Sequence, residues 1–150
     1  MEKIAKMGQE LPPDRLLRSC NRFICNIVAC MYNIFISYDE FYESAKKKYV
    51  DPPTKLRCGI ARGSVFPIGG GLDFVGPCIN ISSRLQKFNG LSFAFSARGI
   101  EEYAFDADLK KDFIKKRVNI RGIGDGELIY VLRDEFDKLP GELKSNFQEV

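Results

Sequence analysis

Histidine is absent from the 150 residues of this chain. A serine or cysteine nucleophile activated by histidine, and a zinc site with histidine ligands, are therefore excluded within it. An excess of one charge is also lacking, because 23 Lys and Arg residues stand against 20 Asp and Glu residues, for a formal net charge of +3. A charge this small does not predict a nucleic-acid partner.

Long hydrophobic runs and paired cysteines are missing as well. The most apolar stretch, residues 23–36, contains Asn26 and Asn33. It is shorter than the roughly 20 apolar residues of a membrane span.

There is no C-x-x-C pair, and no secretory signal is found. We therefore expect a cytoplasmic protein without a membrane partner. Its five cysteines are expected to be buried free thiols: Cys20, Cys25, Cys30, Cys58 and Cys78.

The residues that are present are typical of one globular domain, with 45% hydrophobic and 29% charged side chains. Periodicity predicts a helical region over residues 14–48, broken near residues 37–39, and a helix over 77–88. Shorter helices are expected over 97–105 and 108–113, and strands over 55–63, 64–68, 72–75, 91–95, 116–120 and 127–132. This order predicts an α+β fold, in which helices cover an antiparallel sheet. Residues 1–13 are expected to be a polar lead-in, 14–133 the domain, and 134–150 a loosely attached helical tail.

The segment 58–86 carries the most chemical information. Asp73 lies on an expected strand just before a turn, and Asn80 and Arg84 follow on the helix, four residues apart and hence on one face. An amide and a guanidinium that point the same way can hold a ribose and a phosphate group. From spacing alone, a surface ion pair for Arg84 and a solvent contact for Asn80 are the alternatives.

A further cation, Arg121, precedes a glycine-rich turn and could reach a phosphate or simply belong to that turn. The three glycines at 69–71 are not a phosphate loop, because they lack the G-K-[ST] ending, and no G-x-G-x-x-G is present. Phe93 and Phe95 alternate on a strand. Burial in the core explains them better than base stacking, since no basic face accompanies them.

Two runs together resemble the class III nucleotide cyclase catalytic domain. They are G-I-A-R-G-x-V at 59–65 and D-F-V-G-P-x-I-N-I-x-S-R-L-Q at 73–86. The strand pair K-R-V-N-I-R-G-I-G-D-G-E-L-I-Y-V-L at 116–132 resembles the closing hairpin of that family. The run L-S-F-A-F-S-A-R-G at 91–99 is similar to bacterial pyrimidine cyclases of antiphage signalling, the Pycsar type. The resemblance covers residues 55–133 and implies a cyclase-like fold with a ferredoxin-like core, of which the chain carries the later half.

The resemblance assigns a role to each of the candidate residues. Asn80 and Arg84 match the catalytic residues that orient the ribose and stabilise charge on the phosphate in the transition state. Asp73 matches the residue that helps to select the base, and Arg121 stands where many members have a phosphate-binding lysine. The implied reaction converts a nucleoside triphosphate into a 3′,5′-cyclic nucleotide and pyrophosphate, for cyclic-nucleotide signalling.

The family also uses Mg²⁺ or Mn²⁺, held by two aspartates in its first half. The residues before the long helix, MEKIAKMGQELPPDRLL, carry no such aspartate on a strand. We therefore identify no metal ligand in this chain. The resemblance implies a homodimer, or a heterodimer with a metal-bearing cyclase subunit, and it makes turnover depend on such a subunit or on a missing N-terminal segment.

Two alternatives remain open at this point. The chain could be a non-catalytic cyclase-homology module that binds nucleotide or dimerises, which predicts binding without turnover. It could also be a truncated reading frame without a stable fold, which predicts that thermal unfolding is not cooperative.

Overall fold

The computed structural model describes residues 13–150, with their side chains except those of residues 13–22, 24 and 125. The expected lead-in therefore lies outside the described residues, apart from its last position. The long helical region is confirmed, and it is broken where predicted. Helix α1 (Pro13–Ile36) ends at the turn residue Ser37, and α2 (Tyr38–Ala45) begins directly after it. Ser37 Oγ donates to the Asn33 carbonyl at 2.8 Å and so marks the end of α1.

The fold is α+β, with one five-stranded sheet in the order β1-β4-β6-β5-β7. Its strands are β1 (Cys58–Ile60), β4 (Phe93–Ser96), β5 (Phe113–Ile120), β6 (Gly124–Leu132) and β7 (Phe147–Gln148). The expectation of a wholly antiparallel sheet is wrong, because β1 pairs with β4 in parallel. Helix α3 (Pro77–Leu85) lies between these two strands in the chain, and a helical crossover returns the chain in the same direction.

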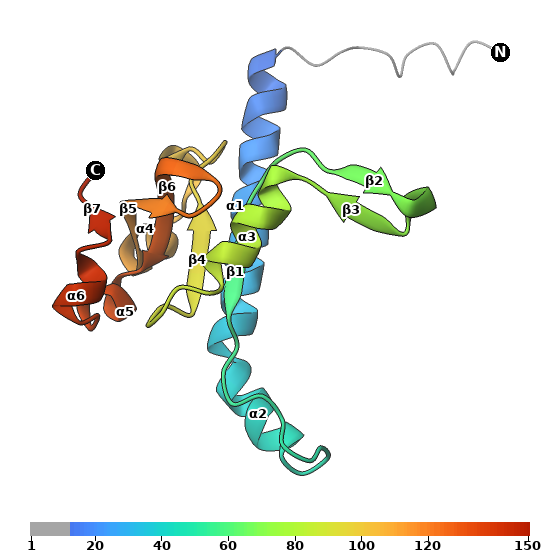
Figure 1. Cartoon of the computed structure of the whole chain (residues 1–150), viewed down its shortest axis with the longest axis vertical. Helices are drawn as coiled ribbons and strands as arrows, with labels where there is room; N and C mark the ends of the chain where they lie inside the picture. Colours follow the sequence, from blue (N-terminus) through green and yellow to red (C-terminus); the bar gives the residue numbers. More distant parts are fainter. Residues whose placement is uncertain (1–12) are drawn as a thin grey trace.

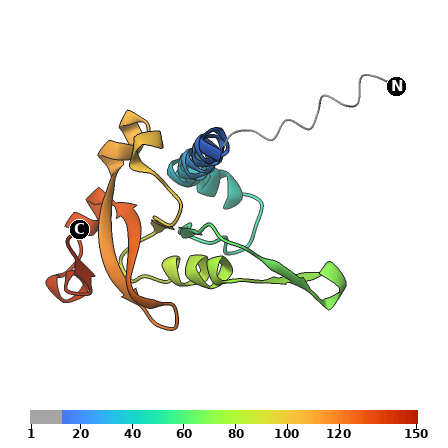
Figure 2. The ribbon, with the colours of Figure 1, turned by 90° about the horizontal axis from the view of Figure 1, so that it is seen from above.

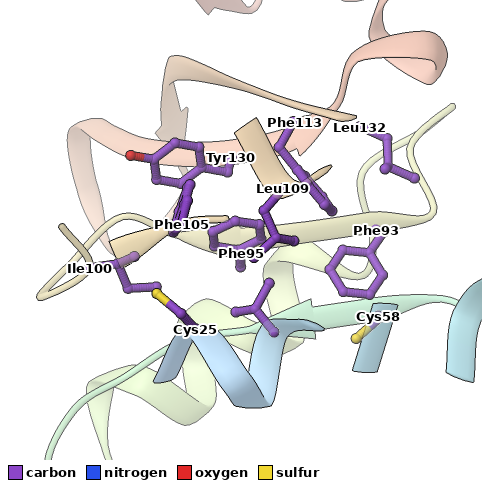
Figure 3. Packing of buried hydrophobic residues seen from close by; sticks show 11 residues of the cluster. Cys25, Cys58, Phe93, Phe95, Ile100, Phe105, Leu109, Phe113, Tyr130 and Leu132 are labelled. Carbon is purple, nitrogen blue, oxygen red and sulfur yellow. The ribbon is translucent and has the colours of Figure 1, made fainter. Parts of the chain in front are cut away.

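Helices cover both faces of the sheet (Figure 2). Strand side chains alternate between the two faces, so each face has its own core. Figure 3 shows the core on the α1 side, where Phe93 and Phe95 are fully buried, as predicted. On the α3 side, Ile81 and Leu85 meet Ala94, Ile129 and Val131.

Gly59 explains how closely α3 lies against β1. A Cβ atom at this position would lie 2.2 Å from the Ser82 carbonyl oxygen and 2.8 Å from the Gln86 backbone nitrogen. Both are backbone atoms, which cannot move aside without shifting the helix. Only glycine therefore permits the close contact that fixes α3, and with it Asn80 and Arg84, on this face of the sheet.

The strands expected over 64–68 and 72–75 form a hairpin, and this arm extends away from the sheet (Figures 1 and 2). It consists of β2 (Phe66–Ile68), the turn η1 (Gly69–Gly71) and β3 (Asp73–Val75). Gly70 has φ +74°, a left-handed conformation that glycine adopts without strain. Every residue of β2 and β3 is exposed.

The expected helix over residues 97–105 is wrong. Only the short turn η2 (Glu102–Ala104) is helical there, and α4 (Ala107–Asp112) follows it. The backbone N–H of Ala97 donates to the Leu128 carbonyl at 2.8 Å, which keeps this residue aligned with β6. Gly99 then turns the chain with φ +65°. Buried Glu127 holds the same segment, since it accepts hydrogen bonds from both Ser96 and Arg98.

The C-terminal segment is not the loosely attached tail that the sequence suggested. It contains α5 (Arg133–Asp137), α6 (Gly141–Lys144) and β7, which pairs with β5. Leu139 is buried in the core on the α3 side, and Phe147 packs against Phe88 and Phe136. This segment therefore belongs to the folded unit.

The cysteines agree with the prediction only in part. Cys25, Cys58 and Cys78 are buried free thiols, and burial raises the pKa of Cys25 and Cys58. Cys30, in contrast, is exposed on α1. The side chain of Cys20 lies outside the described residues. Among residues 13–150, no helix is both long and apolar enough to cross a membrane.

Candidate functional site

Helix α3 presents one polar face, and the sequence explains why. Pro77 occupies the first helical turn, where its missing N–H costs no hydrogen bond. Burial of Ile81 and Leu85 against the sheet turns Asn80 and Arg84 outward, and both are exposed, as the spacing predicted.

The turn between β5 and β6 carries Arg121 to the same place. A cavity of about 310 Å³ lies between this turn and α3. Its lining consists of Asn80, Ser83, Arg84, Lys87, Arg121, Gly122 and Ile123. Three of the four predicted site residues therefore line one cavity, although Arg121 lies about forty positions after Asn80 and Arg84 in the chain.

The charged side chains described in the lining of this cavity are all positive. Arg84, Lys87 and Arg121 line it, and no acidic residue lines it among the side chains that the structure describes. None of the three cations has a hydrogen bond or ion pair with the side chains that the structure describes. Two arginines elsewhere do have protein partners: Arg98 forms an ion pair with Glu127 at 2.6 Å, and Arg62 donates to the Gly99 carbonyl at 2.9 Å. The cavity is thus suited to an anion with several negative charges.

The fourth predicted residue, Asp73, does not line this cavity. It begins β3 on the arm and is exposed there. The structure therefore does not bring Asp73 into the lining of the cavity that the three cations share. Its assignment to base selection stays a prediction.

Lys87 and Ser83 are the site residues that the sequence analysis missed. Positions 80, 83, 84 and 87 follow the three- and four-residue spacing of one helix face. Extending the pair Asn80 and Arg84 by one turn would have found Lys87. The spacing that identifies Lys87 is thus visible within this one helix.

A metal ion does not fit the cavity, because its lining offers cations and amides in place of carboxylates. Within residues 13–150, no three His, Cys, Asp or Glu side chains are grouped to hold a metal ion. We therefore assign no step to a metal bound by this chain.

Two other cavities lie apart from these residues. One of about 420 Å³ lies where α1 and α2 meet the segment before β1, and its lining includes Tyr38, Arg57 and Glu135. Another, of about 240 Å³, includes Glu102, Lys115 and Tyr130.

In the cavity with Glu102, the carboxylate of Glu102 already accepts two hydrogen bonds. Lys115 Nζ and Tyr130 Oη each donate to Glu102 Oε1 at 3.0 Å. These bonds, that from Lys115 first, lower the pKa of Glu102, while burial and then the bond to Glu102 raise the pKa of Tyr130. Because Glu102 is already bonded to Lys115 and Tyr130, we interpret this cluster as structural.

Comparison with known proteins identifies no relative of this chain. No protein-family model matches the chain, and neither the curated proteins nor the solved structures contain a significant match.

Proposed function

We propose that this chain is a nucleotide cyclase-type domain that binds the phosphate chain of a nucleoside triphosphate in the cavity between α3 and the β5–β6 turn. The observation that carries the proposal is that Asn80, Arg84 and Arg121 line one cavity, whose described lining contains no carboxylate. Their positions agree with the roles that the resemblance to class III cyclases implies. The fold would then be the later half of the cyclase-like, ferredoxin-like fold.

The proposed reaction joins the ribose 3′-oxygen to the α-phosphorus and breaks the bond between that phosphorus and the oxygen leading to the β-phosphate. The hydroxyl proton goes to solvent, and pyrophosphate leaves. Asn80 would orient the ribose, while Arg84 and Arg121 would stabilise the negative charge that develops on the phosphates. The product would serve cyclic-nucleotide signalling, including antiphage signalling of the Pycsar type.

The proposal requires a partner that carries the metal-binding aspartates. The sheet offers a place for additional chain, because β1 is its terminal strand and its outer edge pairs with no strand among residues 13–150. The backbone N–H of Cys58 points inward to the Ser92 carbonyl, so the groups of Gly59 face the open edge. A segment that supplies a strand here would extend the sheet, and a metal-bearing cyclase subunit could supply the aspartates.

Turnover is the direct test. The purified chain is incubated with ATP, GTP, CTP or UTP and Mg²⁺ or Mn²⁺, alone and with a cyclase subunit that carries the metal aspartates. We expect a 3′,5′-cyclic product, identified by mass spectrometry, only with the partner. Arg84→Ala should abolish it, while Arg133→Ala, which changes an arginine outside the cavity, should not. Failure to form product with any partner would overturn the enzymatic proposal.

A non-catalytic nucleotide-binding module is the second candidate, and the lining of the cavity favours it, because three cations bind phosphate without a metal. It predicts that the chain binds nucleoside triphosphate equally well with and without excess chelator. It also predicts that no partner produces turnover. Loss of this binding in Arg84→Ala would assign it to the cavity.

A further inference from the structure

Helix α1 has two apolar faces, of which the sheet covers only one. The inner face carries Cys25 and Val28, both buried, and Tyr32 and Phe35, which pack against Phe93. At 100° per residue, the outer face lies nearly opposite and carries Phe23, Ile27, Cys30 and Ile34. We call these four residues the outer stripe.

The outer stripe is open to solvent. Phe23 is 65% exposed, Ile27 38% and Ile34 52%, and Cys30 is exposed as well. Figure 2 shows α1 nearly end-on, and no described element covers the side of the helix that faces away from the sheet. A helix that is apolar on opposite faces is normally buried on both. The outer stripe therefore needs a partner surface.

The spacing indicates which kind of surface. The steps between the four residues are four, three and four, which is the heptad pattern of a two-helix seam. Ile27 and Ile34 occupy the a positions, where β-branched residues favour two strands in parallel coiled coils, and Phe23 and Cys30 occupy the d positions. The repeat therefore fits a covering helix with the same spacing, and a parallel pair would place equivalent residues in the same layers.

The absence of charged side chains along the outer stripe favours a second copy of this same chain. No Asp, Glu, Lys or Arg occurs from position 23 to position 38. The residues beside the stripe include Asn26 and Asn33, both exposed and uncharged. A charged partner gains no ion pair here, and two identical helices meet no like-charge repulsion.

We propose that the outer stripe of α1 is a dimerisation surface, on which the α1 helix of a second copy packs in parallel. This pairing is separate from the cation cavity, the cavity lined by Arg84, Lys87 and Arg121, and it does not depend on the proposed catalytic role. The stripe offers roughly 300 Å² of apolar surface per copy, which lies below the usual size of a stable interface. The dimer should therefore be weak, with a dissociation constant on the order of tens of micromolar.

Sedimentation velocity over a concentration series tests the pairing. The wild-type chain should shift from monomer to dimer as its concentration rises through the micromolar range. Ile34→Asn should weaken the dimer at least tenfold. The matched variant Ile36→Asn changes an equally exposed isoleucine that lies off the stripe, and it should dimerise like the wild type. Circular dichroism of both variants checks that α1 remains helical.

Crosslinking tests the parallel register. In a Cys20→Ser background, Cys30 is the exposed thiol among the described cysteines. A parallel pair places the two Cys30 side chains in one layer, so a short bismaleimide should join them, and Cys30→Ser should abolish the product. A chain that stays monomeric at all concentrations, an Ile36→Asn variant as impaired as Ile34→Asn, or a dimer that Cys30 does not crosslink would each overturn the proposal.

Discussion

Asn119 fastens the turn that carries Arg121, because its Oδ1 accepts a hydrogen bond of 2.7 Å from the backbone N–H of Gly126. The strands are out of register at this point: Val118 faces Glu127, while Ile120 already faces Gly124. Two residues of β6 thus stand opposite one residue of β5, a β-bulge. The side chain of Asn119 replaces the backbone bond that the bulge removes, and it acts on Arg121 through the turn.

Asn119→Ala should loosen this turn and so reduce the affinity for phosphate. Loss of the bond should lower the free energy of unfolding by about 1 kcal/mol. The affinity for inorganic triphosphate, measured by calorimetry, should fall because Arg121 is held less firmly. Asn146→Ala is the matched control, since Asn146 also makes an exposed bond to backbone, at 3.3 Å to the Leu143 carbonyl, outside the lining of the cation cavity. Equal losses of affinity in both variants would contradict this role.

Lys87 should contribute to anion binding although the sequence analysis did not select it. Lys87→Gln removes one of the three cations of the cavity and leaves an uncharged polar side chain. We expect the affinity for inorganic triphosphate to fall about fivefold, equivalent to about 1 kcal/mol, and its salt dependence to weaken. Lys138→Gln removes an exposed lysine outside the cavity lining and should change neither quantity. An unchanged affinity in Lys87→Gln would remove Lys87 from the site.

Local spacing allowed part of this site to be predicted. Asn80 and Arg84 lie four residues apart on a helix whose start Pro77 marks, so their shared face follows from helix geometry alone. Their meeting with Arg121 is a long-range contact, and only the resemblance suggested it. The parallel pairing of β1 with β4 was missed for a similar reason, since strands this short show no preference for direction.

The C-terminal segment shows the limit of sequence periodicity most clearly. Residues 134–150 have many charged side chains and short apolar spacings, which are typical of an exposed helix. Their attachment depends on single side chains. Leu139 lies against Gly90, where a Cβ atom would come within 2.4 Å of it, and such a contact leaves no periodic signal.

Leu139→Ala should therefore destabilise the whole chain. A buried leucine that is cut to alanine leaves a cavity and costs about 2–5 kcal/mol. Chemical denaturation followed by circular dichroism should show this loss in one cooperative transition. Leu72→Ala truncates a leucine that is 87% exposed on the arm, and it should change the free energy of unfolding by less than about 0.5 kcal/mol. An equally small change for Leu139→Ala would restore the view of a loosely attached tail.

Tyr32 should make the stability of the chain fall at alkaline pH. Burial, followed by its 3.1 Å hydrogen bond to Asp112, raises the pKa of Tyr32 to about 12, whereas an unfolded tyrosine has a pKa of about 10. The folded chain thus keeps a proton that the unfolded chain loses. This contribution to stability is complete below about pH 10 and is lost as the pH rises toward about 12.

Denaturation of the wild type and of Tyr32→Phe between about pH 9 and pH 12 measures this dependence. The free energy of unfolding should decline less steeply in Tyr32→Phe. Some decline should remain, because Tyr130 also has a raised pKa. Tyr49→Phe changes a tyrosine that is 65% exposed and should retain the wild-type slope. If Tyr32→Phe retained that slope as well, the hydroxyl of Tyr32 would not be coupled to folding.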